Sequence, residues 1–305
     1  MTAVGEDGWS VWPAPAKLNL FLRIVGRRAD GYHLLQTVFQ LLDWGDTLRL
    51  RVRTDAQIVR VDGAPGVAAE RDLCVRAARA LAEYAEAEFG ADIALEKRIP
   101  MGGGLGGGSS DAATVLVALN ELWGTGLAVD ELAELGLRLG ADVPVFVRGH
   151  SAWAEGVGEK LTPVALPPRQ YVILDPHETV PTAALFQAAE LTRNSAAATI
   201  ESFLSGIATD NVFAPVVRAR YANVAAALDW LGRYGDARLS GSGGCVFVAA
   251  PSDDAAQAMV RDCPREFSAY RARGVDRSAL ADALDAHRTS EKLKRQEESR
   301  PCRDS

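Results

Sequence analysis

The spacing of apolar residues along this chain changes between two periods. Short runs that alternate or are continuously apolar, bounded by turn residues, predict strands, and runs with apolar residues three and four apart predict helices. Strands are expected over residues 18–25, 34–42, 47–53, 93–97, 171–176, 245–250 and 267–271. Helices are expected over residues 72–89, 114–123, 129–139, 182–191, 200–204, 221–234 and 253–261. The polar, glycine-containing segments 26–31 and 43–46 predict turns.

The order of these elements indicates the fold class. Strands and helices are mixed without a regular β-α-β alternation, so an α+β fold is favoured over a doubly wound sheet. The pattern changes near residue 156, which predicts one domain over residues 10–155 and a second over 156–284. Residues 1–10 are interpreted as a disordered lead. Residues 285–305 hold 11 charged side chains of mixed sign and predict a disordered tail or a frayed helix.

Composition excludes several classes of protein. A hydrophobic content of 48% over 305 residues is enough for large cores, whereas a net charge of −7 argues against a nucleic-acid binder or a membrane-surface binder. The four cysteines are scattered without a C-x-x-C pair, which predicts reduced thiols and a cytoplasmic protein. We find no secretory signal, and no apolar run approaches the ~20 residues that cross a bilayer.

The most informative stretch is residues 100–113, which read PMGGGLGGGSSDAA. Six glycines in seven residues carry a large entropic cost on ordering, and they allow backbone N–H groups to approach a ligand closely. A helical pattern follows directly, with Ser109, Ser110 and Asp111 where caps and first-turn residues belong. A glycine-rich loop that opens into a helix N-terminus predicts a phosphate site, because unpaired N–H groups and the helix dipole both face the anion.

Three common phosphate-binding motifs do not fit this loop. A Walker A loop ends in Gly-Lys-Ser/Thr, but here Gly108 is followed by serine. The dinucleotide fingerprint G-x-G-x-x-G is formally present, yet any glycine run produces it, and the second strand with its acidic residue is missing. The His-Arg-Asp and Asp-Phe-Gly motifs of protein kinases are also missing.

The loop resembles the phosphate motif of the GHMP superfamily, the small-molecule kinases named for galactokinase, homoserine kinase, mevalonate kinase and phosphomevalonate kinase. Residues 12–20 (WPAPAKLNL) and 238–247 (RLSGSGGCVF) resemble its N-terminal and C-terminal motifs. Residues 28–33 (RADGYH) and 140–146 (GADVPVF) resemble the branch that acts on 4-diphosphocytidyl-2-C-methyl-D-erythritol. The resemblance runs in order from about residue 12 to about residue 277, nearly the whole chain.

This resemblance implies a fold and an activity. The fold would be a two-domain GHMP-kinase-like α+β structure, with a ribosomal-protein-like, ATP-binding N-terminal domain and a ferredoxin-like C-terminal substrate domain. The activity would be ATP-dependent phosphorylation of the 2-hydroxyl of that cytidyl diphosphate compound, giving the 2-phosphate and ADP in non-mevalonate isoprenoid precursor synthesis. ATP chemistry implies Mg²⁺, but the sequence offers no dedicated carboxylate cluster, and Ser110 or waters are the candidate ligands.

The resemblance also implies two catalytic residues. The aspartate that matches Asp142 is the base that takes the proton of the acceptor hydroxyl, and the lysine that matches Lys17 stabilises negative charge beside it. Each has an alternative reading from the residues alone. Asp142 follows the helix-stop residue Gly140 and could cap a neighbouring helix, and a lone lysine is usually a solvated surface charge.

The ATP site implied by the resemblance has two parts. Leu73 and Lys97 align near the adenine pocket, but this chain has Asp72 where relatives often have asparagine, and an ionised carboxylate cannot donate a hydrogen bond. The phosphate cradle would be formed by Pro100, Met101, Gly102, Gly103, Gly104, Leu105, Gly106, Gly107, Gly108, Ser109 and Ser110.

The acceptor site is implied in the same way. Tyr32 and His33 would recognise cytosine, by stacking on its face and bonding to its edge, with Phe186 on the other face. From the residues alone the first two could equally be ordinary loop residues. The resemblance also implies polar contacts from Asn19 and Thr182. It implies an active-site loop at Gly241 and Gly243, which from the residues alone could be no more than a tight turn.

Two other functions stay open on sequence grounds. The chain could be a GHMP-type kinase for another small alcohol such as mevalonate or homoserine, although those substrates offer no base for Tyr32 and His33 to contact. It could also be a non-catalytic nucleotide-binding sensor, although both Lys17 and Asp142 are retained. The sequence leaves the oligomeric state open, a homodimer included.

Overall fold

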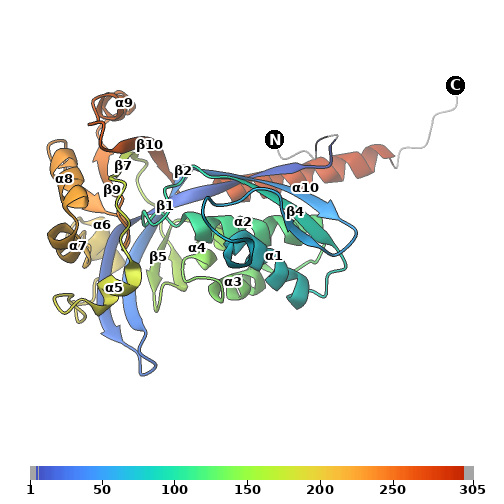
Figure 1. Cartoon of the computed structure of the whole chain (residues 1–305), viewed down its shortest axis with the longest axis horizontal. Helices are drawn as coiled ribbons and strands as arrows, with labels where there is room; N and C mark the ends of the chain where they lie inside the picture. Colours follow the sequence, from blue (N-terminus) through green and yellow to red (C-terminus); the bar gives the residue numbers. More distant parts are fainter. Residues whose placement is uncertain (1–4, 6, 299–305) are drawn as a thin grey trace.

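The computed structural model describes residue 5 and residues 7–298 (Figure 1). The strands are β1 (Ser10–Arg27), β2 (His33–Arg53), β3 (Ile58–Arg60), β4 (Gly90–Glu96), β5 (Ala152–Glu155), β6 (Lys160–Pro163), β7 (Gln170–Asp175), β8 (Arg238–Leu239), β9 (Val246–Ala250) and β10 (Ser268–Val275). The helices are α1 (Leu73–Tyr84), α2 (Gly107–Leu122), α3 (Val129–Leu137), α4 (Val143–Arg148), α5 (Thr182–Gln187), α6 (Ile200–Leu204), α7 (Ala214–Arg220), α8 (Ala222–Leu231), α9 (Asp253–Arg261) and α10 (Ala279–Glu298). The α+β class is confirmed.

Two long antiparallel strands, β1 and β2, form the spine of the molecule. β2 pairs with β4 along its C-terminal half, with β5 at Thr37–Phe39, and with β10 at Leu41 and Leu42. The pairing with β10 joins this sheet to β7, β9 and β8, so the strand order is β3-β4-β2-β10-β7-β9-β8. Register shifts interrupt β1 between Pro15 and Lys17 and between Asn19 and Phe21. Such bulges re-aim side chains, and here they lie at two residues expected in the site.

The turn expected at residues 43–46 is wrong, because β2 runs through it without a break. Gly45 pairs with Pro15, and a Cβ on Gly45 would lie 2.1 Å from the carbonyl oxygen of Ala14. The glycine is therefore required by the close approach of β1, not by a change of chain direction. Asp46 in the same segment is buried and points into the protein.

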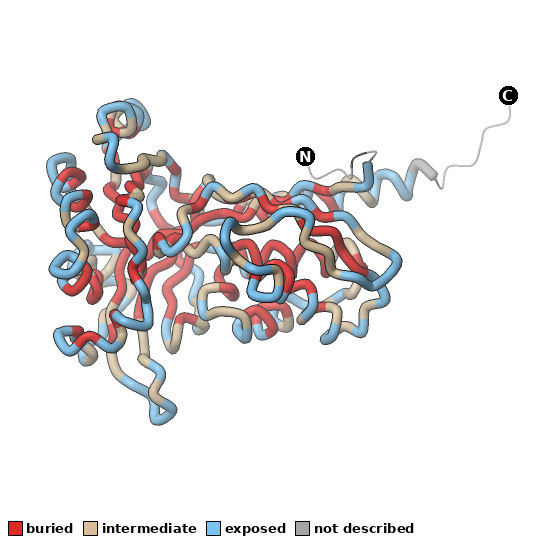
Figure 2. Tube along the Cα trace, in the orientation of Figure 1, coloured by how far each residue is buried: buried red, intermediate tan, exposed pale blue. Residues whose placement is uncertain are grey.

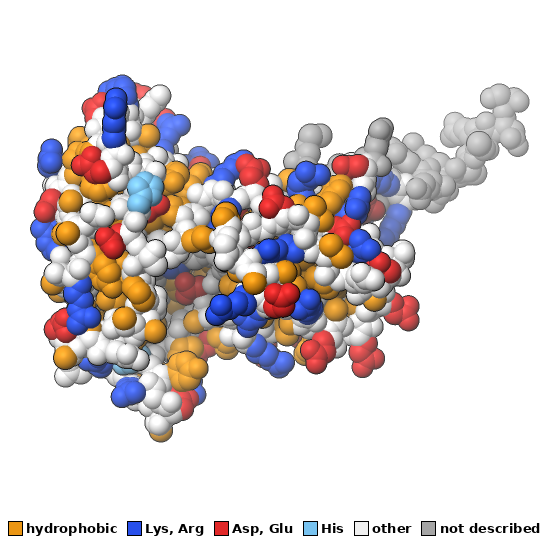
Figure 3. Space-filling view, in the orientation of Figure 1, with side chains coloured by type: hydrophobic (Ala, Val, Ile, Leu, Met, Phe, Trp, Pro, Cys, Tyr) orange, Lys and Arg blue, Asp and Glu red, His pale blue; other side chains and the backbone are white. Residues whose placement is uncertain are grey.

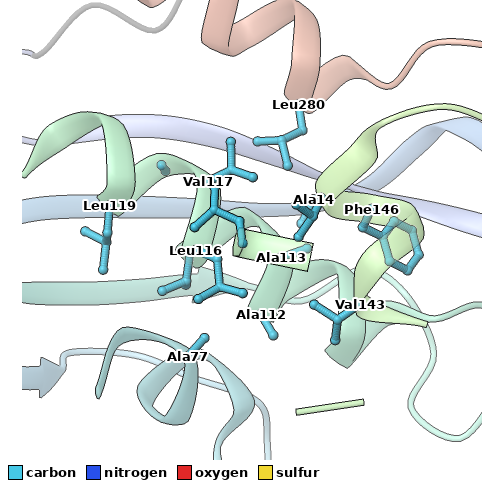
Figure 4. Packing of buried hydrophobic residues seen from close by; sticks show 14 of the residues in the cluster. Ala14, Ala77, Ala112, Ala113, Leu116, Val117, Leu119, Val143, Phe146 and Leu280 are labelled. Carbon is cyan, nitrogen blue, oxygen red and sulfur yellow. The ribbon is translucent and has the colours of Figure 1, made fainter. Parts of the chain in front are cut away.

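Helix α2 is the centre of the first hydrophobic core. All residues from Ser110 to Asn120 are buried, so this helix is covered on every side (Figure 2). Figure 4 shows its Ala113, Leu116 and Val117 among side chains of neighbouring elements, including Ala77 of α1 and Leu280 of α10. A buried helix of this kind gives the glycine-rich loop at its start a rigid support.

Two more cores lie beyond this one. In the second, α5, α7, α8 and α9 pack on β7 and β9 together with Leu22 and Ile24 of β1. The third joins Leu18 and Leu105 to Ile173 and Phe247, so it bridges the two halves. The division at residue 156 remains a prediction, and β1 contributes to cores on both sides of it.

The structure describes part of each chain end. Of the two alternatives for residues 285–305, a disordered tail or a frayed helix, residues 285–298 are helical as the end of α10, and residues 299–305 lie outside the described residues. Leu280, Ala283 and Leu284 anchor α10 to the first core, while His287 lies 5.4 Å from the ring of Trp12. Charge-rich composition hid this apolar face. At the other end, the disordered lead expected over residues 1–10 is wrong for Ser10, which is buried in β1, and residues 1–4 and 6 of that lead lie outside the described residues.

Several short or late elements were also missed by the pattern. β3, β6 and α7 have too few residues to show a period, and the second helix begins at residue 107 instead of 114 because glycines and serines mask its first turns. The cysteines that the structure describes, Cys74, Cys245 and Cys263, are free thiols, as the sequence predicted, and Cys302 lies outside the described residues. Among the described residues, no helix is both long and apolar enough to cross a membrane.

The anchoring of α10 can be tested with two leucines of the same helix. Leu280→Ala removes a side chain that is 1% exposed and should cost about 2–5 kcal/mol in the free energy of unfolding, through lost burial and a cavity. Leu293→Ala removes one that is 56% exposed and should change stability by less than about 0.5 kcal/mol. Urea unfolding followed by circular dichroism measures both, and equal effects would show that α10 is not anchored at Leu280.

Candidate active site

A cleft of about 1410 Å³ runs between the two halves of the molecule (Figure 3). It collects nearly every residue that the sequence singled out. Those that line it are Lys17, Asn19, Tyr32, His33, Leu73, Lys97, Pro100, Met101, Gly102, Gly103, Gly104, Leu105, Gly106, Gly107, Gly108, Ser109, Asp142, Thr182, Phe186 and Gly241. Ser110 and Gly243 are not among the lining residues.

Lys17 and Asp142 meet in this cleft. The Nζ atom of Lys17 lies 3.2 Å from Oδ2 of Asp142 and donates to Oδ1 of Asn19 at 2.5 Å and to the carbonyl of Gly104 at 3.0 Å. The lysine is 3% exposed, so it is not a solvated surface charge. Asn19 is fixed in turn, because its Nδ2 donates to Thr37 on the neighbouring strand. Three acceptors thus hold one buried ammonium group in a single position.

Asp142 stands at the N-cap position of α4, yet its side chain makes no capping hydrogen bond. Its carboxylate turns to Lys17 instead and keeps about a third of its surface exposed to the cleft. The capping alternative therefore does not describe this residue. A carboxylate and an ammonium group side by side at a cleft can accept a proton and stabilise negative charge at one point.

The glycine-rich loop lies back to back with the loop that precedes β9. A Cβ on Gly104 would lie 2.0 Å from the carbonyl oxygen of Ser240, and a Cβ on Gly243 would lie 2.0 Å from the nitrogen of Gly104. The amides of Gly244 and Cys245 donate to the carbonyls of Gly102 and Gly103. Gly243 therefore supports the phosphate loop from behind, away from the cleft surface.

Ser240 adds a side-chain tie to this junction, which the sequence did not single out. Its hydroxyl donates to the carbonyl of Gly104 at 2.9 Å and accepts from the amide of Asn19 at 3.4 Å. The Gly104 carbonyl thus accepts from Ser240 and from Lys17. One backbone oxygen links the loop, the lysine and the second half of the molecule.

The loop becomes helix α2 at Gly106, which has φ +74° and makes no side-chain cap. A Cβ there would lie 2.8 Å from the ring of Phe146 and 3.1 Å from Cε of Lys17. The N–H groups of the first turn have no intrahelical partner and carry the positive end of the helix dipole. The cap is therefore Gly106, and Ser109 and Ser110 lie in the first turn of the helix, which is one of the two placements expected for them.

A buried charge cluster lies beneath this helix start. Nζ of Lys97 is 2.5 Å from Asp46 and 2.8 Å from Asp111, and the other oxygen of Asp46 accepts from the amides of Arg98 and Ile99. Burial raises the pKa of Asp111 to about 7, against the opposing effect of Lys97. Burial alone would lower the pKa of Lys97, but its two carboxylate partners raise it. Asp46 was missed because its partners, Lys97, Arg98 and Ile99, are 51 to 53 residues away in sequence.

The adenine end of the expected ATP site is shaped by the start of α1. Asp72 caps this helix, accepting from the amide of Cys74 at 2.9 Å, and its other oxygen accepts from Arg60 at 3.0 Å. Both carboxylate oxygens thus already have a protein donor. Leu73 follows directly and lines the cleft beside Gly108.

The opposite end of the cleft carries aromatic side chains. The rings of His33 and Phe186 stack with centroids 4.9 Å apart, and Phe213 meets Phe186 edge-on. Burial, then the charges of Arg27 and Arg193, lowers the pKa of His33, and its Nε2 is buried without a partner. Tyr32 is 66% exposed on the turn before β2, while Thr182 shares a hydrogen bond with Ser242.

Metal ligands are few in this cleft. The described part of the chain contains no group of three histidine, cysteine or acidic side chains placed to hold an ion. The hydroxyl of Ser110 and one oxygen of Asp111 are buried without hydrogen-bond partners beneath the helix start. This donor set fits an ion that arrives with phosphate and water ligands of its own.

Comparison with known proteins finds similar sequences along most of the chain. Residues 72–150 match the family model for the GHMP kinases N terminal domain, and residues 188–269 match the model for GHMP kinases C terminal. The chain is 60% identical over 287 residues to a 4-diphosphocytidyl-2-C-methyl-D-erythritol kinase of Xanthomonas campestris pv. campestris (strain B100), covering 94% of this chain and 97% of the relative. It is 56% identical over 275 residues to the enzyme of that name from Halorhodospira halophila, covering 89% and 95%.

Solved structures extend the comparison. A crystal structure of 4-(cytidine 5'-diphospho)-2C-methyl-D-erythritol kinase superposes with a TM-score of 0.77 at 34% identity, covering 87% of this chain and 99% of that one. Methanococcus jannaschii mevalonate kinase superposes with a TM-score of 0.62 at 16% identity, covering 89% and 100%. The second likeness shows the fold alone.

Two glycines with the same backbone conformation test the phosphate loop. Gly106 and Gly124 both have positive φ, but a methyl group on Gly106 would displace Phe146 or Lys17, whereas one on Gly124 would meet nothing within 4 Å. Gly106→Ala should weaken binding of a non-hydrolysable ATP analogue at least about tenfold, and Gly124→Ala by less than about twofold. Calorimetric titration of both folded variants measures this, and unchanged affinity in Gly106→Ala would remove the loop from nucleotide binding.

Proposed function

We propose that this chain, which belongs to the 4-diphosphocytidyl-2-C-methyl-D-erythritol kinase family of GHMP kinases, transfers the γ-phosphoryl group of ATP to the 2-hydroxyl of that compound. The products are the 2-phosphate and ADP, in the non-mevalonate route to isoprenoid precursors. The observation that carries the proposal is the Lys17–Asp142 pair, which lies in the cleft and is tied to the glycine-rich loop through Gly104.

The proposed chemistry needs one base and several charge-stabilising groups. As the substrate oxygen bonds to the γ-phosphorus and the bond from that phosphorus to the β-phosphate oxygen breaks, Asp142 takes the hydroxyl proton. Lys17 holds the carboxylate in place and offsets negative charge on the reacting oxygens. The unpaired amides at the start of α2 hold the phosphates, because they face the cleft at the positive end of the helix.

Mg²⁺ fits this site as an ion carried by the nucleotide. It prefers to keep several waters and to take only one or two protein ligands, and it neutralises charge on the phosphates of ATP. Of the two candidate ligands, Ser110 and waters, we propose that waters link the ion to the protein, because the Ser110 hydroxyl is buried and does not line the cleft. The described residues supply no larger ligand set.

The aromatic end of the cleft distinguishes the acceptor alcohol. A cytosine ring offers a face for stacking and an edge with donors and acceptors, which suits Phe186, Tyr32 and the unpartnered Nε2 of His33. Mevalonate and homoserine have no such ring, so these three side chains favour the cytidyl substrate over another small alcohol. Asn19, Thr182 and Gly241 also line the cleft, and they are the proposed contacts to the rest of the substrate.

A non-catalytic nucleotide sensor on the same fold is disfavoured. Such a protein has no need for a buried lysine held by three acceptors beside a cleft-facing carboxylate. The proposal also includes a cytoplasmic location, because the cysteines follow no disulfide pattern, and it leaves a homodimer open.

Removing the proposed base should affect turnover and spare ATP binding. Asp142→Asn should lower kcat by roughly 10²–10⁴-fold, the usual value of a positioned general base, with little change in the Kd of ATP. A matched control is Asp130→Asn, which alters an exposed aspartate of α3 outside the cleft and should keep normal kcat. A steady-state assay with the cytidyl substrate measures kcat of both variants. Near-normal turnover of Asp142→Asn would exclude Asp142 as the base.

Removing the exposed aromatic should affect the acceptor alone. Tyr32→Ala should weaken binding of the cytidyl substrate by about 1–3 kcal/mol, roughly 5- to 150-fold in Kd, through the loss of one base stack. Affinity for an ATP analogue should hold, because the adenine is proposed to lie at the other end near Leu73. Tyr84→Ala, at a half-exposed tyrosine outside the cleft, is the control. Equal weakening of both ligands, or of neither, would contradict the cytidine pocket.

A further inference from the structure

Phe186 lies at the end of a short helix and is followed by a segment with little regular structure. Helix α5 ends at Gln187, and residues 191–199 have no helix or strand. A loop of this length has to be ordered by side chains if the residues beside it are to hold a fixed position. The position of Phe186 in the cleft therefore depends on what fixes this segment.

Arg193 supplies that fixation. Its guanidinium donates to the carbonyls of Phe186 at 2.8 Å, Ala188 at 2.7 Å and Leu191 at 2.9 Å. These carbonyls lie at and beyond the C-terminus of α5, where a cation is favoured by the helix dipole and by carbonyls that have no intrahelical donor. One side chain thus closes the loop on itself with three charge-assisted hydrogen bonds.

The position of Arg193 indicates an indirect role. It is half-buried and does not line the cleft, whereas Phe186 does. Its charge nevertheless contributes to lowering the pKa of His33, after burial and Arg27, so the guanidinium is near the ring that stacks on Phe186. Arg193 thus bonds to the backbone of one member of the aromatic pair and acts through its charge on the other.

We propose that Arg193 is a positioning residue for the acceptor base: it holds Phe186 against His33 and so sets affinity for the cytidyl substrate, without a part in phosphoryl transfer. This inference rests on the proposed function for the identity of the base. The structural part of the inference, that Arg193 orders the segment that carries Phe186, does not depend on the proposed function.

The kinetic test separates binding from chemistry. Arg193→Ala should raise KM for the cytidyl substrate about tenfold, while kcat and KM for ATP stay within about twofold. Arg193→Lys keeps the charge with fewer donors in a less fixed geometry, so it should recover part of the loss. The control is Arg218→Ala, which breaks an exposed ion pair to Asp229 in the same half of the molecule and should change neither constant.

A double-mutant cycle tests whether Arg193 acts through Phe186. If it does, adding Arg193→Ala to Phe186→Ala should raise KM by less than about twofold beyond the single Phe186→Ala variant. Independent, multiplying effects would overturn the proposal, because Arg193 would then act by another route. An equal fall in kcat and rise in both KM values would also overturn it.

A third measurement needs no substrate. Amide hydrogen exchange of the segment 182–199 should be faster in Arg193→Ala than in wild type and in Arg218→Ala, and exchange of α2 should be unchanged. Unchanged exchange of this segment would overturn the positioning role. Failure of the wild-type protein to phosphorylate the cytidyl compound would instead refute the proposed function, so the two failures are distinguishable.

Discussion

The structure depends on one close approach between two backbones. The glycine-rich loop and the loop before β9 touch at Gly104 and Gly243, where a side chain on either would overlap the backbone of the other. Because Lys17 and Ser240 both donate to the carbonyl of Gly104, this contact also fixes the buried lysine. Two loops that are far apart in sequence, one from each half of the molecule, thereby form one site.

The long strands transmit this arrangement. β1 carries Lys17 and Asn19 next to two bulges, and it contributes to cores in both halves, so these side chains are set by packing on either side. Helix α2, buried on all sides, holds the other edge of the phosphate loop. The cleft is thus lined by rigid elements near Lys17, and by a side-chain-ordered segment near Phe186.

Local charge, not net charge, prepares the protein for anionic ligands. The chain carries −7 overall, yet a buried lysine, Lys17, and a partly buried one, Lys97, lie at the glycine-rich loop, each beside at least one carboxylate. Such partners offset the cost of burying an ammonium group. The loop amides add donors that carry no formal charge. Anion binding can therefore be confined to one place on an acidic protein.

How much of this could be predicted follows from how local each signal is. The glycine run, and the motifs around Lys17 and Asp142, lie within a few residues of sequence. The sequence therefore predicted the α+β class, which is confirmed, and it singled out the loop and the two side chains that the structure brings together. The sequence did not single out Asp46, Ser240 or Arg193, because their hydrogen-bond partners come near them only in the folded chain. The apolar face of α10 can be recognised only once the core that it packs against is known. Gly45 was placed in a turn because the sequence does not show that the neighbouring strand β1 passes too close for a side chain.

Phosphorus NMR of the reaction itself tests the central claim most directly. The protein would be incubated with ATP and Mg²⁺, first with the cytidyl diphosphate compound, then with free methylerythritol, mevalonate or homoserine. The account predicts a new phosphate monoester on the 2-hydroxyl, with stoichiometric ADP, in the first sample only. Equal phosphorylation of an alcohol that lacks the cytidine, or ADP release without a new monoester, would contradict it.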